Sequence, residues 1–281
     1  MGEVVPAGLL ELHRGLNRDT SEGWHRYSEH RERVTALAPG GDTCAVLGAG
    51  NCNDLDLEAL AGRYRELHLL DLDGEALARA RARQPAEVAA RLVLHAPIDL
   101  SGALHRLDDF KRRTLGPPEL GALPQESANA ALSEIEPRFD TVLSACVLSQ
   151  IMHTCNRALG PQAAQLEIIA CALVIAHLRL VGQLLAPGGT GVIVTDTVSS
   201  QSYALEELWG ERAPLELLDH LEETGNFLSG TSPAFLRRIL RTDEVLGKLV
   251  DPPRLIEPWL WRIDDELTLL AYALTFRRAA G

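Results

Sequence analysis

The chain has 281 residues, of which 46% are hydrophobic and 23% charged, a balance typical of a globular domain that buries a full core. Its 27 lysines and arginines against 39 aspartates and glutamates give a formal net charge of −12, which argues against phosphate-dominated nucleic-acid binding. The five cysteines form no CxxC pair, so we expect neither a metal site nor a disulfide framework. Free cysteines are typical of a reducing compartment, and we expect a cytoplasmic protein. The longest apolar stretch, 168–176, is too short to span a bilayer, and we expect no membrane contact.

The N-terminal residues predict an amphipathic helical segment ahead of the main domain. Residues 6–38 show helical spacing of apolar residues around a polar middle, so we expect a helical segment over 1–42. Trp24 and Tyr27 lie in it just before the first strand, and we expect them to close over the ligand as a lid and contact the substrate. The same two rings could instead pack the helix onto the core.

A glycine turn and a later acid predict a nucleoside site. The apolar run 43–47 ends in Gly48-Ala-Gly50, and the run 66–70 ends in Asp71. Glycines let the backbone turn sharply and approach a ligand without a Cβ in the way. Asp71 follows Gly50 by 21 residues, close to the spacing of roughly 20 expected for a ribose-binding acid. The alternative is a tight turn with a solvated aspartate. We expect Asn53 to cap the helix between the two strands.

Further strand and helix patterns alternate toward the C-terminus. We expect strands at 91–95, 139–144 and 191–196, and a long helix over 161–185. Residues 115–137 hold four prolines and predict a connection or an insertion rather than core. Alternating strands and helices imply a parallel sheet covered on both faces.

The last two strands predict a hairpin. Only residues 263–265 separate the apolar runs 254–262 and 266–276, too few for a parallel crossover. One terminal strand should therefore run against the others. The predicted fold is α/β and Rossmann-like, a mostly parallel seven-stranded sheet with a C-terminal antiparallel hairpin and helices on both faces. We expect this domain over 43–281, with an inserted region near 201–250.

These motifs resemble, in order, those of the class I S-adenosylmethionine-dependent methyltransferases. The resemblance rests on Val46–Gly50, Asp71, the 96–100 segment, Phe139–Ala145 and 184–194, and covers about residues 43–200 together with the hairpin. It implies S-adenosyl-L-methionine as the cofactor. The cofactor-binding residues that it implies are Gly48, Gly50, Asn51, Asn53, Asp71, Asp99 and Ser144. Asn53 replaces the third glycine of the usual motif, and its amide can contact the amino or carboxylate end of the cofactor.

The segment after the fourth strand should hold the groups that meet the acceptor. It contains no Asn/Asp-Pro-Pro-aromatic motif and no Pro-Cys pair, which weighs against amide or adenine N-methylation and against a cysteine nucleophile. His153 is the candidate catalytic base, because imidazole titrates near neutrality. Gln150 and Asp196 are candidate substrate-binding residues. Each of these side chains could instead be a surface or capping residue.

The function that these residues favour is methyl transfer to a small-molecule or peptide acceptor by in-line displacement. Transfer of another group from the same or a decarboxylated cofactor stays open. So does a non-catalytic nucleoside-binding or regulatory protein on the same fold. A nicotinamide-dependent oxidoreductase is the third alternative, against which Asn53 argues, because the third glycine there permits close helix–strand packing.

Overall fold

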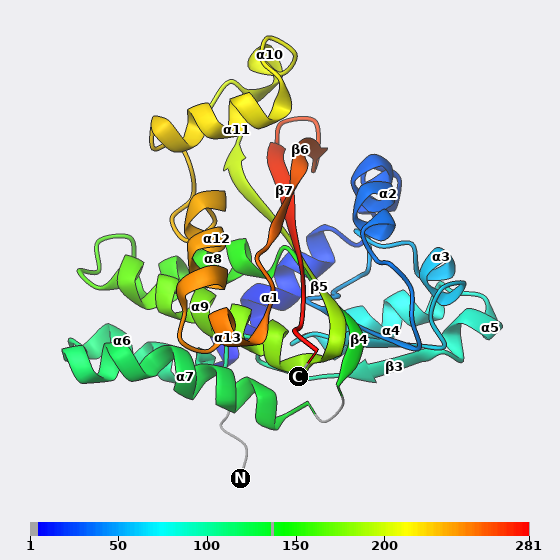
Figure 1. Cartoon of the computed structure of the whole chain (residues 1–281), viewed down its shortest axis with the longest axis horizontal. Coiled ribbons are helices and arrows are strands. Elements are labelled where there is room, and N and C mark those ends of the chain that lie inside the picture. The colour runs from blue at the N-terminus through cyan, green and yellow to red at the C-terminus, as the bar shows by residue number, and fades with distance from the viewer. Residues whose placement is uncertain (1–4, 136–137, 281) are drawn as a thin grey trace.

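One seven-stranded sheet runs through the centre of the protein, in a computed structural model that describes residues 5–135 and 138–280 (Figure 1). The strand order is β3-β2-β1-β4-β5-β7-β6. The strands are β1 (Thr43–Leu47), β2 (Glu66–Leu70), β3 (Leu92–His95), β4 (Phe139–Ala145), β5 (Leu185–Ser199), β6 (Arg254–Arg262) and β7 (Thr268–Arg277). Strands β1 to β5 pair in parallel, whereas β7 pairs antiparallel with both β5 and β6. The predicted fold class is confirmed.

Helices cover both faces of the sheet, as a parallel sheet requires. They are α1 (Ala7–Asp19), η1 (Gly23–His25), α2 (Ser28–Ala36), α3 (Leu57–Ala61), α4 (Gly74–Ala82), α5 (Ala86–Ala89), η2 (Leu104–Arg106), α6 (Leu107–Arg112), α7 (Pro117–Ser133), α8 (Val147–Leu159), α9 (Leu166–Leu184), α10 (Leu205–Leu208), α11 (Pro214–Glu223), α12 (Pro233–Thr242) and α13 (Leu246–Leu249). Helices α2, α3 and α4 pack on one face, and α7, α8 and α9 on the other (Figure 1). Two apolar cores result, one on each side of the sheet.

Helix α7 contradicts the prediction of a connection over 115–137, of which 136–137 lie outside the described residues. Pro117 begins this helix, where its missing N–H would have had no intrahelical partner. Pro124 lies inside the helix and is buried with Leu123 and Ala128. The prolines were therefore not a reliable sign of irregular structure here.

Helix α9 is the long helix predicted over 161–185, but it begins later, at Leu166. Its 19 residues are long and apolar enough to cross a membrane by length and composition alone. Most of it is buried inside the protein, against α7, α8 and the sheet. Burial of this kind is typical of the central helix of an α/β core.

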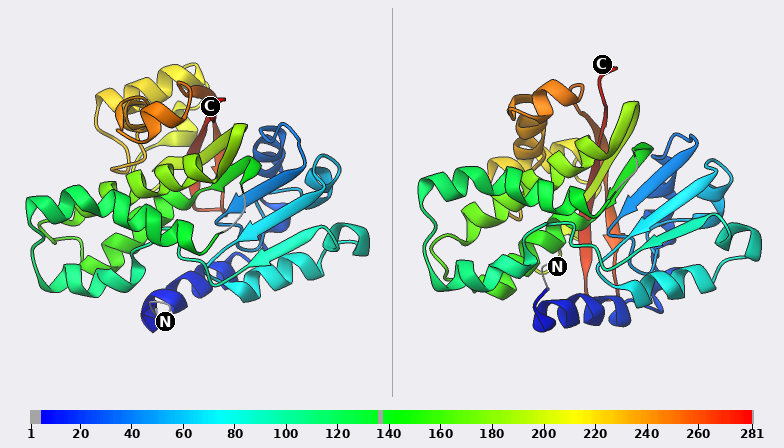
Figure 2. Two further views of the ribbon diagram at one scale, coloured as in Figure 1. Left: turned by 60° about the horizontal axis from the view of Figure 1, so that its bottom comes forward. Right: turned by 90° about the horizontal axis from the view of Figure 1, so that it is seen from below.

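The N-terminal helix α1 lies across the edge of the sheet where the parallel strands end (Figure 2). None of its residues is fully buried. Hydrogen bonds attach α1 and the turn after it to the rest of the protein. Among them are Asn17 Nδ2 to Asp73 Oδ2 (3.1 Å), Asn51 Nδ2 to Asn17 O (2.5 Å), Asn53 Nδ2 to Thr20 O (2.6 Å) and His13 Nε2 with Thr154 Oγ1 (3.2 Å). Together with Leu9 and Leu10, which are half-buried against the apolar core, these polar contacts hold the helix.

Candidate cofactor and acceptor site

The glycine turn after β1 and the acid after β2 form one hydrogen-bonded unit. Gly48 and Gly50 have φ values of 73° and 47°, in the left-handed region that favours glycine. The N–H of Gly50 donates to Asp71 Oδ2 and the N–H of Asp73 donates to Asp71 Oδ1, both at 2.8 Å. Burial raises the pKa of Asp71 to about 6, although these hydrogen bonds oppose the shift. The carboxylate is held rigidly beside the turn.

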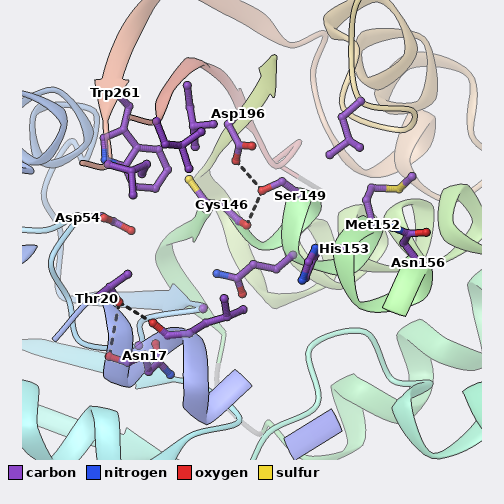
Figure 3. Close-up of a pocket in the computed structure, with 18 of the residues that line it drawn as sticks. Asn17, Thr20, Asp54, Cys146, Ser149, Met152, His153, Asn156, Asp196 and Trp261 are labelled. Carbon is purple, nitrogen blue, oxygen red and sulfur yellow. Dashed lines mark hydrogen bonds between the residues drawn. The ribbon is translucent and has the colours of Figure 1, made fainter. Parts of the chain in front are cut away.

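Two adjoining cavities open at this edge of the sheet. The larger has a volume of about 830 Å³, within the roughly 300–1,000 Å³ of small-molecule sites (Figure 3). The smaller has a volume of about 50 Å³. Gly48 and Gln150 line both, so the two cavities meet beside the glycine turn.

The smaller cavity has the chemistry of a nucleoside site. Leu72, Ile98 and Leu100 supply apolar walls, and Asp71 and Asp99 supply carboxylates. Oδ2 of Asp99 accepts from the N–H of Leu104 at 2.8 Å, which fixes the side chain. A volume of about 50 Å³ lies far below the roughly 300–1,000 Å³ of small-molecule sites, so a nucleoside needs this cavity to widen. His13 lines this cavity from α1. None of the residues of α1 is fully buried, so α1 is the helix that we expect to move.

Two strained backbone positions lie beside the larger cavity. Cys52 and Cys146 have φ values of 52° and 53° and are, among the described residues, the non-glycine residues with positive φ. Both line the larger cavity. Strain of this kind, on the order of 1–3 kcal/mol, clusters at functional sites. Burial raises the pKa of both thiols, so neither is a ready nucleophile.

After Gly50, the residue of the turn that takes a left-handed conformation is Cys52. The expectation that Asn53 caps the following helix is wrong. The cap of the following helix is Asp56, whose Oδ1 accepts from the N–H of Ala59 at 2.9 Å. Asn53 instead bonds the N-terminal segment and lines the larger cavity.

Two carboxylates face the larger cavity around Cys146 (Figure 3). Ser149 Oγ donates to Asp196 Oδ1 at 2.5 Å, from α8 to the end of β5. Burial raises the pKa of Asp54 to about 7, with Arg31 opposing and Asp196 adding to the shift. Burial also raises the pKa of Asp196. No lysine or arginine is among the described residues that line this cavity.

The structure brings most of the predicted site residues together. Gly48, Gly50, Asn51 and Asn53 line the larger cavity with Tyr27, Gln150, His153 and Asp196, and Asp71 and Asp99 line the smaller one. Two predicted residues lie elsewhere. Ser144 is fully buried behind the site, its hydroxyl 2.8 Å from His177 Nε2. Trp24 lies under the guanidinium of Arg31, 3.6 Å from the ring centroid, and lines neither cavity.

Several residues of the larger cavity were not predicted. Asp54 follows the glycine turn directly, and its position there was a usable signal. Asn17 and Thr20 come from the N-terminal segment, and Trp261 comes from the terminal hairpin. Nothing local in the sequence points to these three, because the tertiary fold alone brings them to the cavity.

Solved structures similar to this one were found, but no match at the level of sequence families or curated proteins. No protein-family model matches the chain, and no curated protein matches it. The structure is similar to CalS10, an S-adenosylmethionine-bound amino pentose methyltransferase from Micromonospora echinaspora, at 23% identity and a TM-score of 0.31 over 60% of this chain and 50% of that one. It is similar to YcgJ from Bacillus subtilis at 11% identity and a TM-score of 0.48, over 90% and 100% of the two chains. A protein studied in the conversion of a disulfide bond into a thioacetal during echinomycin biosynthesis matches at 16% identity and a TM-score of 0.42, over 91% and 82%.

At TM-scores below 0.5 these likenesses are too weak to carry an argument about function. The sheet order carries the fold by itself, because it places one antiparallel strand, β7, between β5 and β6. An antiparallel terminal strand was expected from the predicted hairpin, and the structure has it. The chain has a Rossmann-like α/β fold with a seven-stranded, mostly parallel sheet.

Proposed function

We propose that the protein is an S-adenosylmethionine-dependent methyltransferase that acts on a small-molecule or peptide acceptor. The observation that carries this proposal is the Gly50–Asp71 unit at the meeting point of two cavities. The smaller cavity has apolar walls and two carboxylates, which suits a nucleoside. The larger one has room for a second ligand beside it.

The residues present fit this cofactor in chemistry. We assign Asp71 and Asp99 to the ribose and adenine, and the residues from Gly48 to Asn53 to the methionine end. A Cβ at Gly48 would lie 2.5 Å from Val147 Cγ2, so the turn leaves no spare space there. S-adenosylmethionine supplies an electrophilic methyl group when bound. The protein then has mainly to align an acceptor with it, and alignment alone can contribute several kcal/mol.

The acceptor side is assigned to the larger cavity. Gln150, Tyr27 and Asp196 line it and are proposed to bind the acceptor. His153, exposed on α8 at the same cavity, is the proposed base for an acceptor that is protonated at working pH. We place the protein in the cytoplasm, which its five free cysteines support.

Calorimetry with S-adenosylmethionine and S-adenosylhomocysteine tests the proposal. We expect both to bind, and an absence of heat with both would remove the cofactor assignment. Tight binding without transfer of a labelled methyl group across a broad acceptor panel would favour a regulatory protein. Binding of a nicotinamide dinucleotide in their place would favour the oxidoreductase.

A further inference from the structure

Two oxygen acceptors in the wall of the larger cavity have no hydrogen-bond donor. Asn53 is 5% exposed, and its Nδ2 donates to the carbonyl of Thr20, while its Oδ1 has no partner. Oδ1 of Asp54, the next residue, is also buried without a partner. Leaving such groups unpaired costs free energy, and more for a charge. Both oxygens are buried, so it is the residues Asn53 and Asp54 that line the cavity, with these two atoms turned away from solvent.

The groups around Asp54 do not neutralise it. His30 Nε2 lies 4.0 Å from Asp54 Oδ1, beyond hydrogen-bond distance. Trp259 Nε1 donates to His30 Nδ1 at 3.1 Å, so Nδ1 carries no proton, and burial lowers the pKa of His30 to about 3. The imidazole is therefore neutral.

Arg31 is also engaged elsewhere. Its guanidinium donates to the carbonyls of Trp24 at 2.7 Å and of Asn53 at 3.0 Å, and it does not line the cavity. Its charge acts on Asp54 only at longer range. The carboxylate thus faces the cavity without an ion-pair partner of its own.

The rest of the cavity suits a cation with an apolar body. Asp196 faces it from the end of β5, and its recorded side-chain partner is the Ser149 hydroxyl. Tyr27 and Trp261 meet edge to face at 5.4 Å and line the same space. His30 stacks on Trp261 with 4.0 Å between ring centroids, so Tyr27 and Trp261 supply apolar contact rather than an open aromatic face.

We propose that the acceptor is an amine, held as its ammonium ion by Asp54 and Asp196 beside Tyr27 and Trp261. This inference rests on the proposed function. An ammonium group has three donors and no acceptor, which matches a wall that carries the Asp54 and Asp196 carboxylates and, among the described residues, no lysine or arginine. A carboxylate or phosphate group would meet two like charges with no basic side chain to offset them.

An ammonium ion must lose one proton before its nitrogen can accept a methyl group. His153, the proposed base at the same cavity, would take that proton and pass it to water. The neutral nitrogen would then form its bond to the methyl carbon as the carbon–sulfur bond breaks, with the electron pair of that bond staying on sulfur. The products would be the methylated ammonium and S-adenosylhomocysteine.

The test compares three probes of one shape and different charge. 2-Phenylethylamine, 2-phenylethanol and phenylacetate are titrated into the full chain at pH 8, with and without S-adenosylhomocysteine. We expect the amine to bind at least about tenfold more tightly than the alcohol, which corresponds to about 1.4 kcal/mol, and phenylacetate to bind least. Equal affinities, a preference for the anion, or no binding of the amine would overturn the inference.

Two variants locate the preference. Asp54→Asn and Asp196→Asn should each reduce amine affinity about tenfold and leave the alcohol unchanged. Asp219→Asn, an exposed acid on α11, is the matched control and should change neither. If Asp54→Asn fails to fold by circular dichroism, Asp196→Asn decides the outcome. Unchanged amine affinity in the folded variants would contradict the assignment.

The two proposals fail separately. Amine preference in a protein that does not bind S-adenosylhomocysteine would leave the cation site and remove the methyltransferase. Binding of S-adenosylhomocysteine without amine preference would leave the methyltransferase and remove the amine acceptor.

Discussion

The backbone N–H of Gly50 donates to Oδ2 of Asp71 over 2.8 Å and joins the turn after β1 to the acid after β2. Asp71→Ala removes this bond and the carboxylate proposed to receive the ribose hydroxyls. We expect it to weaken S-adenosylhomocysteine binding by about 1–3 kcal/mol, because charge-assisted hydrogen bonds are lost. Calorimetry on variant and parent measures the difference. Unchanged affinity in a folded variant would remove Asp71 from the cofactor site.

Much of the sheet could be predicted because apolar runs and turn residues determine strands locally. Residues 43–47, 66–70 and 254–262 form strands with the predicted bounds. The left-handed conformation of Cys52 could not be predicted, because nothing in the sequence marks a cysteine for a φ of 52°. Alternation along β6 puts Trp259 and Trp261 on one face, but it does not tell which face meets Tyr27. Contacts of that kind depend on the tertiary fold.

Crowding at Gly48 predicts a loss of stability that exceeds the ordinary penalty for a left-handed residue. An added Cβ would lie 2.5 Å from Val147 Cγ2, at a φ of 73°. Gly188 has a φ of 77° with nothing within 4 Å of an added Cβ, and is the matched control. Gly188→Ala should cost about 1–2 kcal/mol in free energy of unfolding, and Gly48→Ala a further 1–3 kcal/mol or so. Denaturant unfolding measures both, and equal losses would show that Val147 gives way.

His153 predicts a separation of catalysis from cofactor binding. His153 lines the larger cavity and does not line the smaller one, to which the nucleoside is assigned. His153→Ala should keep the affinity for S-adenosylhomocysteine and slow methyl transfer on the order of 100-fold if the imidazole takes a proton from the acceptor. Asn156→Ala, in the same helix and cavity, is the control that removes polarity without a titrating group. Equal rates in both variants would remove His153 from the mechanism.

The raised pKa of Asp54 predicts how stability changes with pH. The folded chain keeps this proton up to a pKa of about 7, whereas the unfolded chain loses it near 4, so between those values the folded state binds more protons. Stability from this group is therefore present at pH 4 and lost as the pH rises to 7. Arg31 and Asp196 affect Asp54 electrostatically, and His30, 4.0 Å away, stays neutral throughout.

Asp54→Asn tests this directly. At pH 8 the variant should be more stable than the parent by on the order of 1–4 kcal/mol, since one pKa unit corresponds to about 1.4 kcal/mol. At pH 4 the two should be alike. The pKa of Asp71 is also raised, so both proteins should lose some stability as the pH rises from 4 to 6, by a smaller amount than Asp54 causes. A variant that is less stable at pH 8 would mean that Asp54 is compensated in the folded protein.

Helix α1 predicts that the cofactor enters by local opening. The smaller cavity, at about 50 Å³, must widen to admit a nucleoside, and His13 of α1 lines it. No residue of α1 is fully buried, whereas most of α9 is, so α1 should open at lower free energy. Hydrogen exchange should show faster exchange in α1 than in α9, slowed by S-adenosylhomocysteine. Asn17→Ala, which removes the bond to Asp73, should raise the rate of association and leave α9 unchanged. If α1 exchanges as slowly as α9 and does not respond to the ligand, widening must come instead from the η2 side, where Leu104 lines the same cavity.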